Sequence, residues 1–196
     1  GLERGPQQDQ ARAGAHAPEI CEIFANFVDL SLDEEKSRIP LRLKELAIIT
    51  VGRVFGSDYE WFIHAKRAVE YGIDPDAVEE MRQNRVPTFP NDDETLVYEV
   101  AKELAETRQL SDENYARALD HFGEGAMVEL AALVGFYHTV SIVLNTFQVE
   151  APEGAYRRAS EICMALDTDG LRGELTLIRA ARASAAPGSP RSPSTI

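Results

Sequence analysis

The stretch IPLRLKELAIITVGRVFG, residues 39–56, constrains the fold more than any other part of the sequence. Pro40 is a favourable first residue of a helix and Gly56 a favourable stop, so the stretch predicts a single helix. Its middle, residues 46–51, is apolar almost all the way round rather than on one face. A helix of this kind needs cover on all its sides. We therefore expect it to be the central, buried helix of the protein.

Helical patterns also fill most of the remaining sequence, and no segment reads as a strand. Gly, Pro, Asp and Ser residues separate these patterns, as they do at helix ends. The fold class is therefore predicted to be all-α, with about seven or eight helices in one domain of residues 18–152. The further segments expected to be helical are 17–30, 57–72, 74–84, 92–109, 111–123 and 124–147.

The two ends of the chain differ in composition from this domain. Residues 1–17 are polar and lack the apolar core of a secretory signal, so we expect a disordered leader. Residues 153–183 carry a weak helical pattern and are expected to form a helical appendage. Residues 184–196 are rich in small residues and proline, which predicts a disordered tail.

The formal net charge of −13, with no offsetting basic stripe, argues against nucleic acid or an anionic membrane as a partner. No apolar run reaches the roughly 18 residues that a membrane-spanning helix needs. Cys21 and Cys163 are far apart and form no C-x-x-C pair, so both are expected to be reduced thiols. A cytoplasmic protein is the resulting expectation.

Glu60 and His64 lie four residues apart at the start of the helix predicted at 57–72. Side chains at this spacing are neighbours on a helix, so the carboxylate can orient the imidazole and raise its basicity. Such a pair is a candidate proton shuttle at neutral pH. Ser57-x-x-Glu60 is also a capping box, in which the two residues cap the helix start. The two interpretations are compatible.

Glu45 lies on the helix expected to be buried, where desolvation would raise the pKa of its carboxyl group toward values useful in proton transfer. The alternative is an ion pair with Arg42, one turn away. Tyr137 and His138 lie in an apolar helix, where His138 is either a hydrogen-bonded core residue or part of a pocket. His121 precedes a helix end and fits a partner of the helix dipole.

A metal site would need a third ligand besides Glu60 and His64, such as His138 or His121. No spacing in the sequence requires this arrangement, so we expect no metal. The sequence contains no H-E-x-x-H motif, phosphate-binding loop or nucleophile elbow.

The stretch LRLKELAIITVGRVFGSDYEWFIHAKRAVEYGI, residues 41–73, resembles the carboxymuconolactone decarboxylase family, which includes alkylhydroperoxidase D-like proteins. In that family an arginine and a glutamate open a buried helix, and the next helix holds a histidine followed by alanine and glycine. The resemblance extends over residues 18–152 and implies an alkylhydroperoxidase D-like helical bundle. The matching residues are Arg42, Glu45, His64, Ala68 and Gly72.

The peroxidase branch of the family carries C-x-x-C-x-x-x-H, with a glutamate twelve residues before the first cysteine. With the histidine placed on His64, the two cysteines fall on Ser57 and Glu60, and the glutamate falls on Glu45. A hydroxyl and a carboxylate cannot form a disulfide. The dithiol peroxide cycle is therefore not expected here, although peroxiredoxin activity is a frequent label in this superfamily.

The decarboxylase branch lacks these cysteines and uses no cofactor. The resemblance therefore implies a lyase or isomerase that transfers a proton on a small carboxylated lactone or ketone. His64 would be the acid–base residue, with Glu60 and Glu45 as its orienting and relay carboxylates. Arg42 or Arg53 would hold the substrate carboxylate.

Further residues are expected to line the substrate site, namely Ser57, Trp61, Tyr137 and His138. Members of the family assemble as trimers or hexamers, which implies a homo-oligomer. Three alternatives to the lyase remain. One is a peroxide-related activity without the dithiol cycle, and another is a noncatalytic helical oligomer or small-ligand-binding module. The last is a metal-dependent oxygenase that uses Glu60, His64 and a distant histidine.

Overall fold

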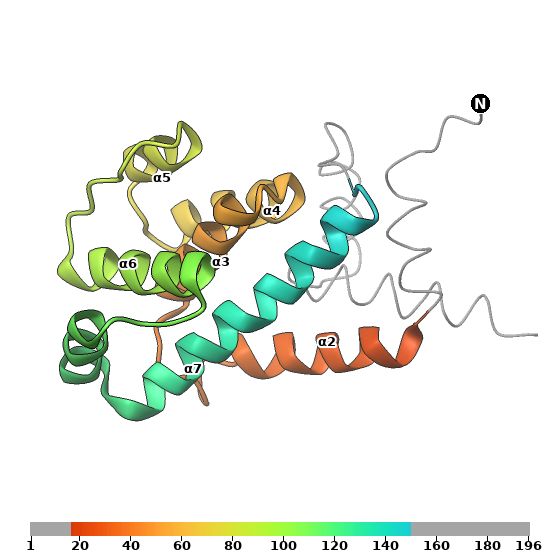
Figure 1. Ribbon diagram of the computed structural model, residues 1–196, viewed down its shortest axis with the longest axis horizontal. Helices are drawn as coiled ribbons and strands as arrows, with labels where there is room; N and C mark the ends of the chain where they lie inside the picture. The colour runs from red at the N-terminus through yellow and green to blue at the C-terminus, as the bar shows by residue number, and fades with distance from the viewer. Residues whose placement is uncertain (1–16, 150–196) are drawn as a thin grey trace, which may run out of the picture.

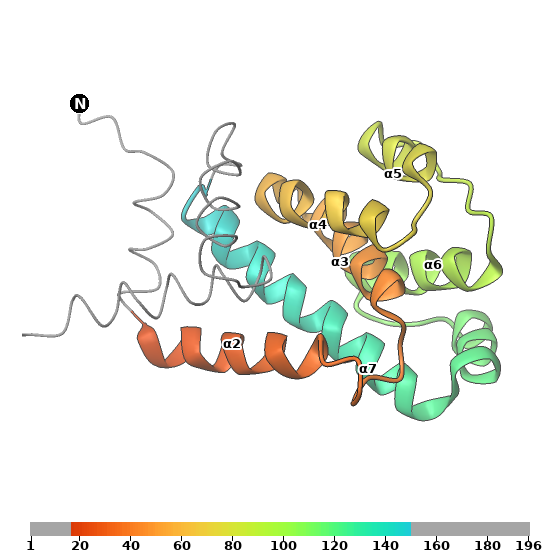
Figure 2. The ribbon, with the colours of Figure 1, turned by 180° about the vertical axis from the view of Figure 1, so that it is seen from behind.

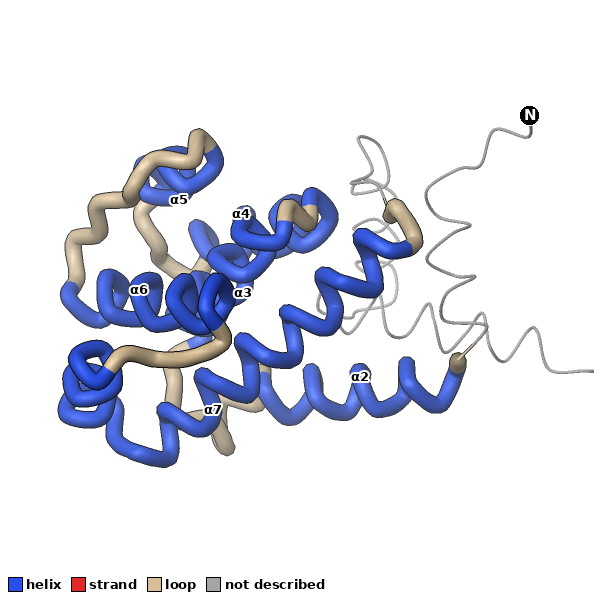
Figure 3. The backbone as a smooth tube through the Cα atoms, viewed as in Figure 1, coloured by secondary structure: helices blue, strands red, loops and turns tan. Residues whose placement is uncertain are grey.

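The computed structural model describes residues 17–149, and every regular element in this part of the chain is a helix (Figure 3). The predicted all-α class is confirmed. The predicted count of about seven or eight helices is not confirmed, because residues 17–149 form six helices and the predicted segments 111–123 and 124–147 are joined in one of them. Cys163 and most of the predicted leader, appendage and tail lie outside the described residues. The helices are α2 (Pro18–Ser31), α3 (Leu41–Phe55), α4 (Asp58–Glu70), α5 (Pro75–Arg82), α6 (Asp92–Thr107) and α7 (Asp112–Thr146).

Helix α3 is the centre of the described fold, as its apolar sequence predicts. Residues 43–52 are all buried, and α3 packs against α4, α6 and α7 (Figure 1). Helices α4, α6 and α7 thus cover it on different sides, while α5 follows α4 at the edge of the molecule (Figures 1 and 2). This arrangement places side chains from several elements around α3.

Helix α7 is interrupted near its start. Gly123 has φ 77° and ψ 166°, and it is the only residue with non-helical angles between Asp112 and Thr146. Glycine tolerates this conformation because it has no Cβ. The break agrees with the helix end that the sequence predicts at Gly123. By length and composition α7 alone, among the described residues, could cross a membrane, a test that core helices of soluble proteins also meet.

Helix α2 packs against α7 through aromatic side chains. The Phe27 ring stacks on Phe136 with 4.3 Å between ring centroids, and Phe24 meets Phe136 edge-on at 5.2 Å. Both ribbon views show α2 beside α7 (Figures 1 and 2).

The loop between α2 and α3 is held by a buried ion pair. Lys44 Nζ lies 3.0 Å from Glu129 Oε1 on α7 and also donates to the carbonyl oxygen of Ser31. The same carboxylate accepts hydrogen bonds from the Ser37 hydroxyl and from the Arg38 backbone N–H. A lysine that is 1% exposed needs such partners, because an unpaired buried charge is costly.

The turn between α3 and α4 corrects one expectation. Gly56 adopts the left-handed conformation that ends α3 (φ 61°), and Ser57 follows as the N-cap residue of α4. The predicted capping box is wrong, because Ser57 makes no side-chain cap hydrogen bond. The Ser57 backbone N–H donates to Gly52 O at 2.9 Å, and the Glu60 side chain turns toward His64 instead.

Candidate active site

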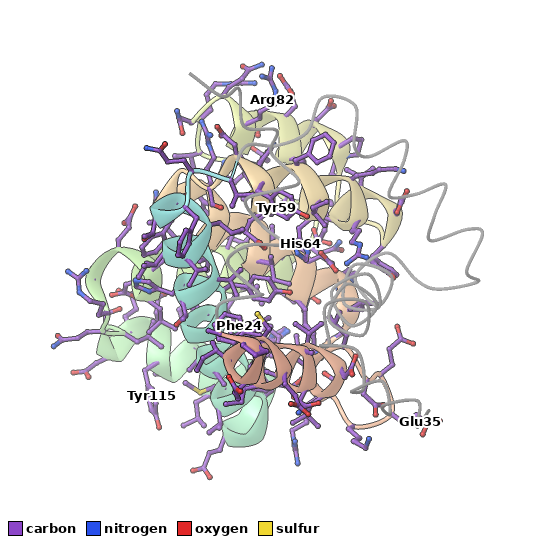
Figure 4. All side chains as sticks on the ribbon, turned by 90° about the vertical axis from the view of Figure 1, so that its right-hand side faces the viewer. Phe24, Glu35, Tyr59, His64, Arg82 and Tyr115 are labelled. Atoms are coloured by element: carbon purple, nitrogen blue, oxygen red, sulfur yellow. The ribbon has the colours of Figure 1, made fainter. Side chains whose placement is uncertain are left out.

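The packing of α3 on α4 brings Glu45 against His64, 19 residues later in the chain. His64 Nδ1 lies 2.6 Å from Glu45 Oε2, and each side chain is only 1% exposed. Gly52 on α3 permits this close packing, because a Cβ there would lie 3.2 Å from the Glu60 Cβ. Figure 4 shows His64 in the interior, whereas Glu35, Arg82 and Tyr115 lie near the periphery.

Glu60 approaches the other nitrogen of the same ring. Its Oε2 lies 3.3 Å from His64 Nε2, and its side chain is 6% exposed. The imidazole is therefore held between two buried carboxylates, tightly at Nδ1 and more loosely at Nε2. The spacing of Glu60 and His64 on one helix face, together with Glu45 on the neighbouring helix, produces this arrangement.

Burial has the largest single influence on the pKa of His64, and acting alone it would lower this pKa by disfavouring the imidazolium. The Coulombic attraction of Glu45 and the hydrogen bonds to Glu45 and Glu60 act in the opposite direction. They outweigh burial and raise the pKa of His64 to about 9. At neutral pH the ring is therefore an imidazolium with a proton on each nitrogen.

Helix α7 completes the surroundings of His64. The Tyr137 ring meets the imidazole edge-on, with 5.3 Å between ring centroids. His138, next in sequence, instead packs on Phe55 at the end of α3, with ring centroids 4.0 Å apart. Of these two predicted pocket residues, the structure brings Tyr137 to His64 and places His138 against Phe55.

Two buried hydroxyl groups near this region make no hydrogen bond in the structure. Ser57 Oγ stands at the start of α4, and Ser141 Oγ lies on α7. Ser141 follows Tyr137 by one helical turn and precedes Asn145, whose amide donates to the carbonyl oxygen of Phe55. The face of α7 that carries Ser141 therefore lies along the end of α3 and the start of α4. Ser141 could not be singled out from the sequence, because one serine in an apolar helix gives no pattern.

The two arginines expected to clamp a substrate carboxylate have protein partners. Arg42 Nη1 lies 2.6 Å from Glu94 Oε1, and its Nη2 donates to Asp93 at the start of α6. Arg53 donates to the carbonyl oxygens of residues 81 and 82 at the end of α5, at 3.2 and 3.0 Å. Its guanidinium carbon also lies 5.7 Å from the centre of the Trp61 ring. The predicted Arg42–Glu45 ion pair is not formed, because both side chains have other partners.

Among residues 17–149 no group of three or more His, Cys, Asp or Glu side chains is arranged to hold a metal ion. His138 contacts Phe55, and the His121 ring contacts Phe122. Neither supplies a third ligand beside Glu60 and His64.

Within residues 17–149 these features define a helical fold in which a buried histidine ring lies between two carboxylates. The comparisons agree with this class. Residues 12–103, a little under half of the chain, match the profile of the carboxymuconolactone decarboxylase family. The match contains Glu45, Glu60 and His64 and ends within α6. Tyr137 and Ser141 therefore lie beyond it.

A second profile, the AAA lid domain, matches residues 156–187, which lie outside the described residues. Over 38 residues the chain is 63% identical to the magnesium-chelatase 38 kDa subunit of Acidiphilium rubrum. Over 39 residues it is 59% identical to that of Rhodobacter capsulatus. These matches cover 19–20% of the chain and only 11% of each relative. No solved structure gave a significant match.

Proposed function

We propose that this protein is a cofactor-independent lyase or isomerase of the carboxymuconolactone decarboxylase type, which moves a proton on a small carboxylated lactone or ketone. The observation that carries the proposal is the His64 ring held between Glu45 and Glu60. A buried, charged imidazole with a raised pKa is the kind of perturbed group that marks acid–base sites.

The two ring nitrogens have different roles in this proposal. Glu45 holds the Nδ1 proton at 2.6 Å and fixes the orientation of the ring. The Nε2 proton has a longer contact, 3.3 Å to Glu60, and is the one available to a substrate. The imidazolium is then the general acid, and Glu60 is the base that accepts a proton from a substrate carbon. Proton transfer in both directions balances without a cofactor.

The alternatives fit the site less well. A dithiol peroxide cycle needs two thiols, and Ser57 and Glu60 occupy the corresponding positions. A noncatalytic module in which Ser57 and Glu60 serve only as a helix cap has lost its main support, because that cap is not formed. A peroxide-related activity without thiols would have to use His64 and its two carboxylates, and none of these groups is a thiolate that a peroxide oxidises to a sulfenic acid.

The test is His64-dependent proton exchange. We expect deuterium from D2O to enter small lactones and ketones at the carbon next to the carbonyl, measured by proton NMR in parallel with ultraviolet loss of γ-carboxymuconolactone. His64→Gln and Glu60→Gln should each lower the rate at least about 100-fold, as loss of a general acid or base does. His121→Gln is the matched control, because His121 is exposed and contacts Phe122. Equal rates in wild type and His64→Gln would refute the proposal.

The match of residues 156–187 to the AAA lid domain favours a second function in this part of the chain. We infer that residues 156–187 have a role like that of an AAA lid domain, whose profile they match. The 196 residues contain no G-x-x-x-x-G-K-[S/T] motif, so nucleotide binding is not assigned to them. In this proposal the segment contacts an AAA protein, and the proton-transfer site belongs to residues 18–152. A cytoplasmic location is part of the same proposal.

A further inference from the structure

The His64 ring is held closely at one nitrogen and loosely at the other. Glu45 Oε2 lies 2.6 Å from Nδ1, whereas Glu60 Oε2 lies 3.3 Å from Nε2. One short hydrogen bond fixes the distance at Nδ1 but still allows the ring to tilt about that contact. Nε2, the nitrogen that the proposed function turns toward a substrate, is at the end that would move. A contact against the side of the ring would limit this tilt.

Tyr137 on α7 makes such a contact. Its ring centroid lies 5.3 Å from that of the imidazole, and the two ring planes meet at 84°. Edge-to-face pairs at this separation are a preferred arrangement of aromatic rings. Tyr137 is 2% exposed and His64 is 1% exposed. The two rings are therefore in direct contact in the interior, and the tyrosine ring restricts the orientation of the imidazole.

The Tyr137 ring is supported in turn by its neighbour Phe136. Their ring centroids lie 5.2 Å apart, with 87° between the planes. Successive residues on a helix point in directions about 100° apart, so the two side chains reach different parts of the fold. Tyr137 faces the imidazole, and Phe136 touches the side of the tyrosine ring. A side chain that is packed on two sides keeps one orientation.

Phe136 also connects this group to α2. The Phe27 ring stacks on Phe136, with 20° between the planes, and Phe24 meets Phe136 at 73°. Figure 4 shows Phe24 where α2 meets α7. The two phenylalanines are thus aromatic anchors of α2 on α7, and both press on the ring that supports Tyr137.

These contacts form a continuous row of rings from α2 to the site, in the order Phe27, Phe136, Tyr137 and His64. We infer that Tyr137 is a positioning residue that holds the His64 ring against Glu45, and that α2 fixes Tyr137 through Phe136. The part of this inference that concerns catalysis rests on the proposed function. Helix α2 then influences the acid–base site without supplying an acid or a base.

NMR titration of the His64 ring tests the inference without any turnover. The chain has four histidines, and the His64 signal is the one that His64→Gln removes. Tyr137→Leu takes away the ring contact. We expect it to lower the pKa of His64 from about 9 toward its ordinary value, because a tilted ring loses part of its hydrogen bond to Glu45. Tyr137→Phe retains the ring and should keep the pKa of His64 as in wild type.

Phe27→Leu tests the contribution of α2. It removes the stack on Phe136 and leaves Tyr137 in place, so the pKa of His64 should fall by less than in Tyr137→Leu. Phe89→Leu is the matched control, because Phe89 is also a partly buried phenylalanine and contacts another tyrosine, Tyr98, at 5.6 Å. The control should leave the pKa of His64 unchanged. Since Phe27 is only partly buried, this pair of variants decides the question even where Tyr137→Leu does not fold.

Proton exchange in D2O gives an independent measurement. A positioning residue acts on the chemical step, so Tyr137→Leu should lower kcat by about tenfold and leave KM within about twofold. Phe89→Leu should leave both values unchanged. A purely structural role of Tyr137 would lower the free energy of unfolding without this separation of kcat from KM.

Three outcomes would overturn the inference: an unchanged pKa of His64 in Tyr137→Leu, a Tyr137→Phe variant that titrates like Tyr137→Leu, or a Phe27→Leu variant that titrates like Phe89→Leu. The two measurements also separate this inference from the proposed function. A lowered pKa in Tyr137→Leu, with no proton exchange by wild type, would support the positioning role and refute only the proposed activity. His64-dependent exchange that is equal in Tyr137→Leu and wild type would support that activity and overturn the positioning role.

Discussion

The raised pKa of His64 links the protonation of one side chain to the stability of the fold. The folded-state pKa is about 9, against about 6.5 for an unfolded histidine. A raised pKa contributes stability that is fully present below pH about 6.5 and is lost as pH rises through about 9. We expect the stability advantage of wild type over His64→Gln to fall across this range by on the order of 3 kcal/mol.

Urea unfolding at several pH values between these limits measures this effect. His121→Gln is again the control, and its free energy of unfolding should follow that of wild type at every pH. A difference between wild type and His64→Gln that does not change with pH would show that the buried imidazole is neutral in the folded protein.

The residues of the site differ in how far they can be predicted from sequence. Glu60 and His64 can be paired by their spacing alone, and the family resemblance adds Glu45 from the neighbouring helix. The catalytic roles of all three remain predictions. The capping box that local sequence predicts at Ser57 is not formed. The Glu60 side chain instead contacts His64, whose ring is also bound by Glu45 from the neighbouring helix. The buried position of Ser141 could not be predicted from sequence, since it follows from how α7 packs in the fold.

At the scale of elements, the contact of α3 with α4 depends on Gly52. A Cβ at this position would lie 3.2 Å from the Glu60 Cβ, closer than side chains normally pack. We expect Gly52→Ala to lower the free energy of unfolding by about 1–2 kcal/mol, because crowding exceeds the gain in helix propensity. It should also lower the pKa of His64 by moving Glu60 away from Nε2, which NMR titration of the imidazole can measure.

Gly135→Ala is a matched control on α7. A Cβ there meets nothing within 4 Å, and the residue is helical. The substitution should therefore raise the free energy of unfolding by about 0.5–1 kcal/mol. Equal changes in the two variants would mean that the α3–α4 contact adjusts without cost.

Element boundaries follow from the sequence where one local signal dominates. Asp74 accepts a hydrogen bond from the Asp76 N–H at the start of α5, and Ser111 accepts from the Asn114 N–H at the start of α7. Both residues begin segments that the sequence predicts to be helical. The buried middle of α3 was predictable because no exposed helix has an apolar surface on all sides. The partners of Arg42 and Arg53 were not, because they come from distant segments.

At the scale of the whole molecule, an oligomer remains the expectation. Helix α2 exposes Ile20, Ile23 and Leu30, each by about half or more of its surface. Exposed apolar side chains clustered on one helix favour association. We expect light scattering to give the mass of a trimer or hexamer, and Ile20→Gln combined with Ile23→Gln to shift it toward the monomer. A monomeric wild type at all concentrations would contradict this expectation.

Helix α7 contacts His64 through Tyr137, although α7 follows the segment that matches the family profile. Glu45, Glu60 and His64 come from α3 and α4, whereas Tyr137 comes from a helix that follows the matched residues. The residues around the imidazole therefore come from two parts of the chain, its carboxylate partners from the matched segment and Tyr137 from beyond it. Substitutions on this face of α7 can change the surroundings of His64 while Glu45 and Glu60 keep their contacts with its ring.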